Sequence, residues 1–450
     1  MDAILFWNQV SIDANKTDFT TERPDLDPDP QQGGPTRTSR ALAIVHLAMY
    51  DAYAGILDPT KKYLTYSPTE VPGTVNADAA RAAVASAACV TLIDLYSRQQ
   101  EAILKKHIEF VSTLSATNDP EIELGLAWGR LVGAKMLNER KSDGSELSNA
   151  LYAPSAEPGK HRTDPLNSGQ KFLGPLWGRV KPFGIANLTA LPTTPPPPLT
   201  DPKYTTDYNQ VIKKGALNGS TRTPEEITQG LFWAYDGARN IGVPPRLYNQ
   251  AIRAIALKVN SSEAANARLF AIVNVAMADA GIQAWHEKYL YNVWRPVVGV
   301  READQGWGPT GKGDGNDATI GDPFWLPLGS PRTNQPGHNS FTPNFPAYPS
   351  GHATFGAAAF RAAELELNLP EYFKFSFVSD ELNGESIDRD GSVRSRYSHE
   401  LTIATAIEEN LLSRVYLGVH WKFDGTEGRD NGKKIADRIQ SSFPAKATLP

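Results

Sequence analysis

The chain has 450 residues, of which 40% are hydrophobic, and its formal net charge at neutral pH is −5. This length is large for one core and the apolar content suffices for a well-buried globular protein, so we expect two domains or one large helical body. The mildly acidic balance argues against nucleic acid as a partner, and the single cysteine, Cys89, excludes an internal disulfide and metal centres held by several thiolates.

The N-terminal segment Met1–Trp7 has neither the basic start nor the long apolar stretch of a signal peptide. Elsewhere no apolar run reaches the length of a membrane span. We therefore expect no membrane partner, and the sequence alone leaves the compartment open.

The first half of the chain predicts helices. Segments Arg40–Gly55, Ala79–Tyr96 and Glu121–Glu139 place apolar residues at helical spacing. The following segment, Pro158–Pro202, is rich in loop residues and contains four consecutive prolines that favour an extended chain. We expect residues 1–200 to form a helical scaffold bundle with this proline-rich strap packed on its surface, because Trp177 and other apolar side chains of the strap favour burial.

The second half, residues 201–450, also predicts helices. The motif Thr223-Pro224-Glu225-Glu226 has the pattern of a capping box and begins a helix that we expect to carry Phe232–Asp236. Further helices are predicted at Arg246–Val259, Ser262–Val293, Ala353–Glu366 and Glu400–Leu417. The long segment Glu302–Ser340 reads as a functional loop. No segment alternates convincingly as a strand, so the predicted class is mainly α.

Three polar motifs in this half have the composition of one anion site. They are Lys288-x6-Arg295-Pro296, Pro349-Ser350-Gly351-His352 and Ser413-Arg414-x5-His420-x3-Asp424. Together they supply three fixed cations, two imidazoles, a hydroxyl and a glycine backbone, a set that suits phosphate or vanadate. Each motif alone is weak, whereas all three in one chain are specific.

Lys288 and Arg295 are predicted to lie two turns apart on one face of a helix. A solvated basic face is the alternative, but Trp285 and neighbouring aromatic residues leave little of this helix free for water. Buried cations need an anion, which Asp236 or a bound oxyanion could supply.

The other two motifs predict local geometry. Ser350 can cap the helix that follows, and Gly351 lets its backbone approach a ligand closely, although an ordinary cap beside a surface histidine is the alternative. A helix break at Gly418 would let Arg414 and His420 converge. Asp424 could then accept the Nδ1–H of His420, which frees Nε2 as a ligand or nucleophile.

The motifs, together with Phe232–Gly237, Phe345–His352 and Leu417–Trp421, resemble the vanadium-dependent haloperoxidases. The resemblance is to the chloroperoxidase type, within the superfamily that includes the type 2 phosphatidic acid phosphatases, and it spans most of the chain. It implies an all-α fold of two four-helix bundles and a vanadate cofactor.

The resemblance also implies a role for each residue. His420 would bind vanadium through Nε2, and the cofactor oxygens would be held by Lys288, Arg295, Ser350, Gly351 and Arg414. His352 would act as acid and base in peroxide binding with a pKa near its ordinary value, and Lys288 would polarise a peroxide oxygen. Asp236 would pair with Arg414. Trp285 and Phe345 match the halide pocket of the chloroperoxidase type, and Asn344 departs from it by replacing a proline.

The predicted reaction uses hydrogen peroxide to oxidise chloride, bromide and iodide to hypohalous acid, with small organic acceptors and with phosphate as a competitor of vanadate. Whether the acceptor is bound or meets free hypohalous acid is left open. The alternatives are an acid phosphatase with His420 as nucleophile and a non-enzymatic helical binding module. The resemblance suggests a secreted or periplasmic location, and homo-oligomerisation is left open.

Overall fold

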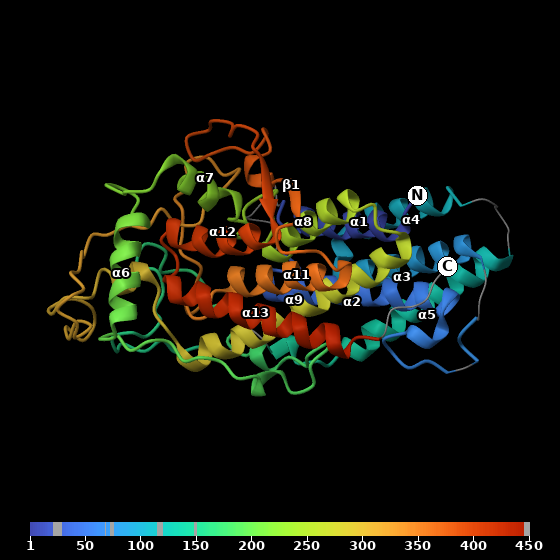
Figure 1. The fold of residues 1–450 in the computed structure, drawn as a ribbon, viewed down its shortest axis with the longest axis horizontal. Coiled ribbons are helices and arrows are strands. Elements are labelled where there is room, and N and C mark those ends of the chain that lie inside the picture. Colours follow the sequence, from blue (N-terminus) through green and yellow to red (C-terminus); the bar gives the residue numbers. More distant parts are fainter. Residues whose placement is uncertain (21–28, 68, 73–75, 115–119, 148–150, 445–450) are drawn as a thin grey trace.

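The computed structural model describes the whole chain except residues 21–28, 68, 73–75, 115–119, 148–150 and 445–450. The described part is mainly α-helical, and most long helices run along the long axis of the molecule (Figure 1). The helices of the first half are α1 (Ala3–Asp18), α2 (Gly34–Leu57), α3 (Ala77–Leu95), α4 (Gln100–Val111) and α5 (Pro120–Arg140). The three helices predicted in this half are confirmed as α2, α3 and α5, whereas α1 and α4 were not predicted.

The helices of the second half supply the predicted site. They are α6 (Pro202–Lys214), α7 (Pro224–Phe232), α8 (Pro244–Lys258), α9 (Glu263–Tyr291), α10 (Pro296–Gly299), α11 (Gly351–Leu367), α12 (Ile403–Tyr416) and α13 (Lys422–Ser442). Single 3₁₀ turns lie at Pro59–Lys61, Ser97–Gln99, Ser145–Leu147, Trp177–Arg179, Leu188–Ala190 and Asp380–Leu382. The predicted capping box begins α7, because the Thr223 hydroxyl accepts from the Glu226 N–H and the Glu226 carboxylate accepts from the Thr223 N–H.

One small antiparallel sheet corrects the prediction that the chain has no strands. Strand β1 (Lys374–Val378) pairs with β2 (Ser398–Thr402), with Lys374 opposite Thr402. Phe375 and Phe377 alternate with polar residues in β1 and are buried, which is the two-residue period of a strand. Glu400 therefore lies in β2, and α12 begins at Ile403 with Thr402 as its cap rather than at Glu400.

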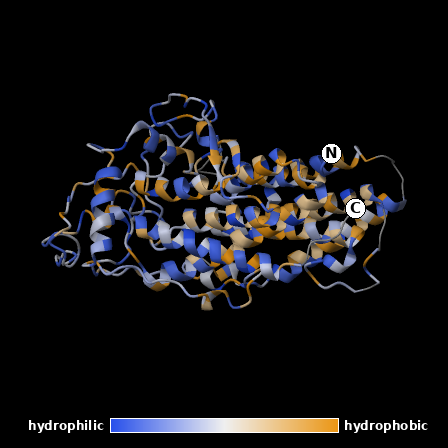
Figure 2. Ribbon diagram, viewed as in Figure 1, coloured by the Kyte–Doolittle hydropathy of each residue, from blue (hydrophilic) through white to orange (hydrophobic). Residues whose placement is uncertain are grey.

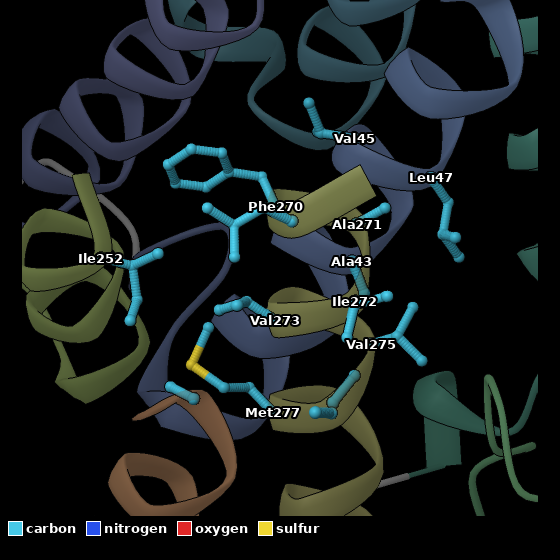
Figure 3. Packing of buried hydrophobic residues seen from close by; sticks show 14 of the residues in the cluster. Ala43, Val45, Leu47, Ile252, Phe270, Ala271, Ile272, Val273, Val275 and Met277 are labelled. Atoms are coloured by element: carbon cyan, nitrogen blue, oxygen red, sulfur yellow. The ribbon is translucent and has the colours of Figure 1, made fainter. Parts of the chain in front are cut away.

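Helix α9 lies at the centre of the packing. It contacts α2 of the first half and α11 of the second, and one cluster of buried apolar residues extends from Ala3 to Phe443. Figure 3 shows Phe270, Val273 and Met277 of α9 inside this cluster, close to Ile252 of α8. In Figure 2 the hydrophobic residues concentrate on these packed helices. The division of the chain near residue 200 stays a prediction.

The strap between the halves packs on the helices as predicted. Trp177 and Phe183 are buried, and Leu191 is partly buried against the core cluster. Asp279 of α9 fixes this part of the strap, because its carboxylate accepts the backbone N–H groups of Phe183, Gly184 and Ile185 at 2.6–2.9 Å.

No single helix among the described residues is long and apolar enough to cross a membrane. Of the helix pairs in the described part of the chain, α3 and Ser97–Val111 pass the same length and composition test together, and these two segments are bent by 119° relative to each other.

Candidate active site

The first polar motif spans a helix end, which corrects the prediction that Lys288 and Arg295 share one helix. Helix α9 ends at Tyr291, where Asn292 adopts a left-handed conformation with φ 57°. Asparagine tolerates this conformation and commonly ends helices with it. Arg295 is therefore the N-cap residue of α10, and Pro296 takes the first position of that helix. The two cations reach the same region from different elements.

Lys288 is fully buried beneath this region. Its Nζ donates to the carbonyls of Pro346 at 2.8 Å and Ala347 at 3.1 Å, and also to that of Pro349. Burial, and then the neighbouring charge of Arg295, hold the pKa of Lys288 well below its ordinary value. Because carbonyls take its three donors, a direct contact with an oxyanion would require Lys288 to exchange one of them.

Arg295 joins the motifs. Its Nε donates to the Phe345 carbonyl at 2.9 Å, and its Nη1 donates to the Val419 carbonyl at 2.7 Å and lies 2.9 Å from Nε2 of His420. Its buried Nη2 has no hydrogen-bond partner among the described residues. This nitrogen is an unsatisfied cationic donor inside the protein, where such groups normally bind an anion or water.

The second motif forms the start of α11. A cis peptide bond precedes Pro349, Ser350 is the N-cap residue, and the Ser350 N–H donates to the Asp424 carbonyl at 2.9 Å. A Cβ on Gly351 would lie 3.3 Å from the Trp285 ring, so little room exists for any larger residue. The first N–H groups of α11 therefore begin beside the third motif.

The third motif turns where predicted. Helix α12 ends at Tyr416, and Gly418 has φ +71°, which breaks the helix between Arg414 and His420. In the new direction His420 Nδ1 lies 2.9 Å from Oδ2 of Asp424, which also accepts the Trp421 N–H at 3.0 Å. This contact favours a proton on Nδ1 and leaves the Nε2 lone pair facing Arg295.

Asp236 reaches the site from the loop after α7. That helix ends at Phe232, and Tyr235 has φ 36°, so the prediction of a helix through Asp236 is wrong. Arg414 Nη2 donates to both carboxylate oxygens of Asp236, at 3.1 and 2.8 Å. Its Nε and Nη1 have no partner among the described residues, so Arg414 also retains free donors.

His352 packs on the same loop. Its Nε2 lies 2.6 Å from the Ala234 carbonyl and 3.8 Å from Oδ1 of Asp236. Burial, followed by the charge of Arg414, lowers the pKa of His352 to about 3. The prediction of an ordinary pKa is therefore wrong, because burial and the charge of Arg414 keep the imidazole neutral even in mildly acidic solution.

Positive charge dominates the electrostatics of the site. Burial and the charges of Arg295, Lys288 and Arg414, in that order, hold the pKa of His420 well below its ordinary value. Burial raises the pKa of Asp236, but Arg414 and then His352 outweigh it and hold this carboxyl below its usual range. Because these side chains shift one another's pKa values, their charges interact across the site. The basic side chains outnumber the carboxylates that could neutralise them.

A cavity of about 290 Å³ opens onto the site. It is lined in part by Asp236, Trp285, Phe345, Gly351, His352, Arg414 and His420, whereas Lys288, Arg295 and Ser350 are not among its lining residues. The Trp285 and Phe345 rings lie 4.9 Å apart between their centroids, and Arg295 lies 4.8 Å from the Phe345 ring centre. The predicted halide pocket is thus an aromatic wall next to the cations.

Two residues near the site were not predicted. His161 of the strap is buried, and burial, then Arg295 and Lys288, hold its pKa well below the ordinary value. Arg332 of the long loop lines the cavity. Their sequence surroundings contain no motif, and only the folded chain brings them to this place.

The donors suit an anion. Among the described residues, no group of three or more His, Cys, Asp or Glu is placed to hold a metal ion. In the part of the chain that the structure describes, Arg295 Nη2 and Arg414 Nε and Nη1 are buried at the site without hydrogen-bond partners. The Nε2 lone pair of His420 accepts from Arg295 Nη1 and would have to exchange this contact to become a ligand. An oxyanion that accepts hydrogen bonds and carries a metal able to take one nitrogen ligand, such as vanadate, fits this set.

A helical fold with this cage of cations around one histidine defines the class of vanadium haloperoxidases and related phosphatases. Residues 1–169 match the sequence family "Vanadium chloroperoxidase N-terminal domain", and residues 268–445 match "VCPO second helical-bundle domain". Vanadium chloroperoxidase of Curvularia inaequalis is 32% identical over 509 residues, which cover 95% of this chain and 80% of that protein. The chain therefore belongs to the vanadium chloroperoxidase family.

Solved structures share the fold. A bacterial vanadium-dependent iodoperoxidase superposes with a TM-score of 0.73 at 19% identity, covering 98% of this chain and 97% of that one. A bacterial vanadium-dependent chloroperoxidase in its holo form superposes with a TM-score of 0.66 at 16% identity, covering 95% of each chain. The predicted all-α haloperoxidase fold is confirmed, with the two-stranded sheet as an addition.

Proposed function

We propose that this protein is a vanadate-dependent haloperoxidase that uses hydrogen peroxide to oxidise chloride, bromide and iodide to hypohalous acid. Family membership implies vanadate as the cofactor. The observation that carries the proposal is the surroundings of His420: its Nδ1 faces Asp424, and its Nε2 lies 2.9 Å from Nη1 of Arg295. Nη2 of the same Arg295 side chain has no hydrogen-bond partner among the described residues.

The chain's own residues would hold vanadate from several sides. His420 Nε2 would bind the metal, Arg295 and Arg414 would donate to its oxygens from the nitrogens that lack partners, and Ser350 and Gly351 would contribute from the start of α11. Lys288 would add positive charge from below. Bound vanadate supplies a Lewis acid that activates peroxide without needing a redox change of the metal.

Proton transfer falls to His352. Its neutral imidazole can accept a proton from incoming peroxide, and Asp236 lies 3.8 Å from its Nε2, close enough to stabilise the charged ring. Arg414 holds Asp236 ionised for this purpose. We therefore assign His352 as the acid–base group and Asp236 as the residue that positions it.

The halide would meet the aromatic wall of Trp285 and Phe345. The guanidinium carbon of Arg295 lies 4.8 Å from the centre of the Phe345 ring, and Nζ of Lys288 lies 5.1 Å from it. An apolar wall beside cations favours an anion that gives up water easily. Bromide and iodide lose water and are oxidised more easily than chloride. Oxidation of chloride is proposed from the match of Trp285 and Phe345 to the chloroperoxidase type.

The phosphatase alternative uses the same groups, with His420 as nucleophile and His352 as the acid for the leaving alcohol. Membership of the vanadium chloroperoxidase family does not favour it as the main activity. Phosphate remains a natural competitor of vanadate because both present similar tetrahedral oxygens to the cations.

The test is a comparison of halogenation with phosphate ester hydrolysis. Vanadate-free protein is assayed for loss of monochlorodimedone with peroxide and each halide while orthovanadate is titrated, and in parallel for hydrolysis of p-nitrophenyl phosphate. We expect halogenation only with vanadate, with bound vanadium measured by elemental analysis. His420→Ala should lose both halogenation and hydrolysis of p-nitrophenyl phosphate. His338→Ala alters an exposed histidine and should retain both activities. Halogenation that ignores vanadate would refute the proposal.

A further inference from the structure

The cavity above the site is larger than halide and peroxide need. Its volume is about 290 Å³, whereas one water occupies roughly 30 Å³ of liquid. Its lining combines charged groups of the site with side chains that are mostly apolar. The apolar lining includes Phe19, Leu173, Val243, Phe341, Phe345 and Phe355. A cavity of this size and character suits a small organic molecule with an unsaturated ring.

Arg332 gives this cavity a cation of its own. The long loop between the first two motifs places it there, with the guanidinium 3.9 Å from the centre of the Phe341 ring. The side chain is half-buried, and no hydrogen bond or ion pair joins it to another described residue. Burial lowers the pKa of Arg332, with Asp236 opposing this effect. Arg332 is thus held against an aromatic ring with its donors unused.

We infer that the cavity binds an organic acceptor that combines an electron-rich ring with a carboxylate, and that the halogen is transferred to this bound molecule. The carboxylate would pair with Arg332, while the ring would lie between Phe341 and Phe345 with its edge toward His352. The inference rests on the proposed haloperoxidase function and names the substrate class of that same site.

The overall reaction balances without a further reactant. One halide ion, one hydrogen peroxide, one proton and one acceptor C–H give the halogenated acceptor and two waters. The halide loses two electrons, which peroxide takes up as its O–O bond breaks. The ring C–H bond is replaced by a carbon–halogen bond, and its proton is taken up in the second of the two waters.

The geometry favours a carboxylate over halide capture as the role of Arg332. A planar guanidinium fixed on a ring presents two parallel N–H groups, which match the two oxygens of a carboxylate rather than a spherical ion. Lys171 also lines the cavity, but its ammonium lies 3.6 Å from Asp29 with about 90% of each side chain exposed, so solvent screens it. Arg332 is therefore the residue that would select the acceptor.

The first experiment is a competition between two acceptors. The vanadate-loaded enzyme receives bromide, peroxide and equal amounts of 3-(4-hydroxyphenyl)propionate and its amide, whose rings react alike. The product ratio is divided by the ratio that reagent hypobromite gives. We expect the enzyme to favour the carboxylate by about 10-fold to 100-fold, the range for one charge-assisted hydrogen bond.

Variants assign the preference to one side chain. Arg332→Gln should bring the ratio to that of hypobromite, and Arg332→Lys should restore part of it. Arg389→Gln removes the same charge from an exposed position outside the cavity lining and should leave the ratio unchanged. A wild-type ratio equal to that of hypobromite, or one that Arg332→Gln does not lower, would overturn the inference.

The second experiment measures binding without turnover. In the absence of peroxide, calorimetry should give a lower Kd for the propionate than for its amide, and Arg332→Gln should remove the difference. Equal affinities in the wild type would count against the inference. If vanadate-dependent bromide oxidation is itself absent, the proposed function fails. If oxidation is present without discrimination between acceptors, only the present inference fails.

Discussion

Gly418 allows a quantitative test of how the third motif is shaped. Replacing it with alanine adds one methyl group at φ +71°, a conformation that disfavours side chains. The new Cβ would lie 2.5 Å from the Gly215 carbonyl oxygen and 3.0 Å from Cβ of Pro327. Two separate costs therefore arise, one from the backbone conformation and one from the clash with a fixed backbone.

Gly219 separates these costs. It has φ +65°, and a Cβ there would meet nothing within 4 Å. In Gly219→Ala the left-handed conformation alone should lower the free energy of unfolding, by about 1–2 kcal/mol. The stiffer unfolded chain should offset about 0.4–1 kcal/mol of this loss. In Gly418→Ala overpacking should lower the free energy of unfolding further, by about 1–3 kcal/mol. The expected difference between the two variants is thus about 1–3 kcal/mol in the free energy of unfolding.

The assay is urea unfolding of both variants followed by tryptophan fluorescence, together with vanadate titration of each folded protein. Gly418→Ala should also raise the Kd for vanadate, because movement of this turn changes the position of His420 relative to Arg414. Gly219→Ala should leave that Kd unchanged. Equal stabilities for the two variants would refute the claim that close backbone contact fixes the turn.

Further predictions concern charge and selectivity. Asp236→Ala should lower the free energy of unfolding by about 3–5 kcal/mol, because it leaves Arg414 buried without its partner, and added vanadate should restore part of this loss in a thermal shift measurement. Phe345→His should lower the ratio of chloride to bromide turnover, measured as kcat/KM for each halide, and an unchanged ratio would show that Phe345 does not select the halide. Phosphate should raise the apparent Kd for vanadate in proportion to its concentration in an equilibrium titration, and a constant Kd would mean that the two anions bind at different places. Burial raises the pKa of Asp51 from 3.8 to about 7, so the folded state binds the carboxyl proton more tightly than the unfolded state does. The resulting contribution to the free energy of unfolding is fully present below pH 3.8 and is lost as the pH rises to about 7. The difference in unfolding free energy between wild type and Asp51→Asn should change over that window, and a constant difference would contradict the raised pKa.

The sequence predicted which side chains of the candidate site lie close together better than it predicted their local structure. Motif spacing was enough to select Arg414, His420 and Asp424, and Gly418 indicated the turn between them. Arg295 was placed on the wrong element because Asn292 ends α9 early, and apolar periodicity does not register one left-handed residue. Asp236 was expected on a helix because the capping box marks where α7 begins and nothing marks where it stops.

Other features depend on tertiary contacts and have no local signal. The ordinary pKa expected for His352 was wrong because burial and Arg414 act only after folding. Arg332 lies in a loop with the composition of many surface loops, and only its contact with Phe341 reveals its position. Strand β1 did carry a two-residue alternation, but five residues are too few to distinguish a strand from a connecting segment.

The central position of α9 limits how this protein can be shortened. The helix contacts α2 along one side and α11 along another, and its last turn carries Lys288. A fragment reduced to residues 201–450 would leave a long row of alanine, valine and isoleucine side chains in water, and such fragments aggregate or bind one another. A smaller catalyst based on this protein would require polar substitutions along that exposed row, so that the candidate site with Lys288, Arg295 and Arg414 keeps its geometry.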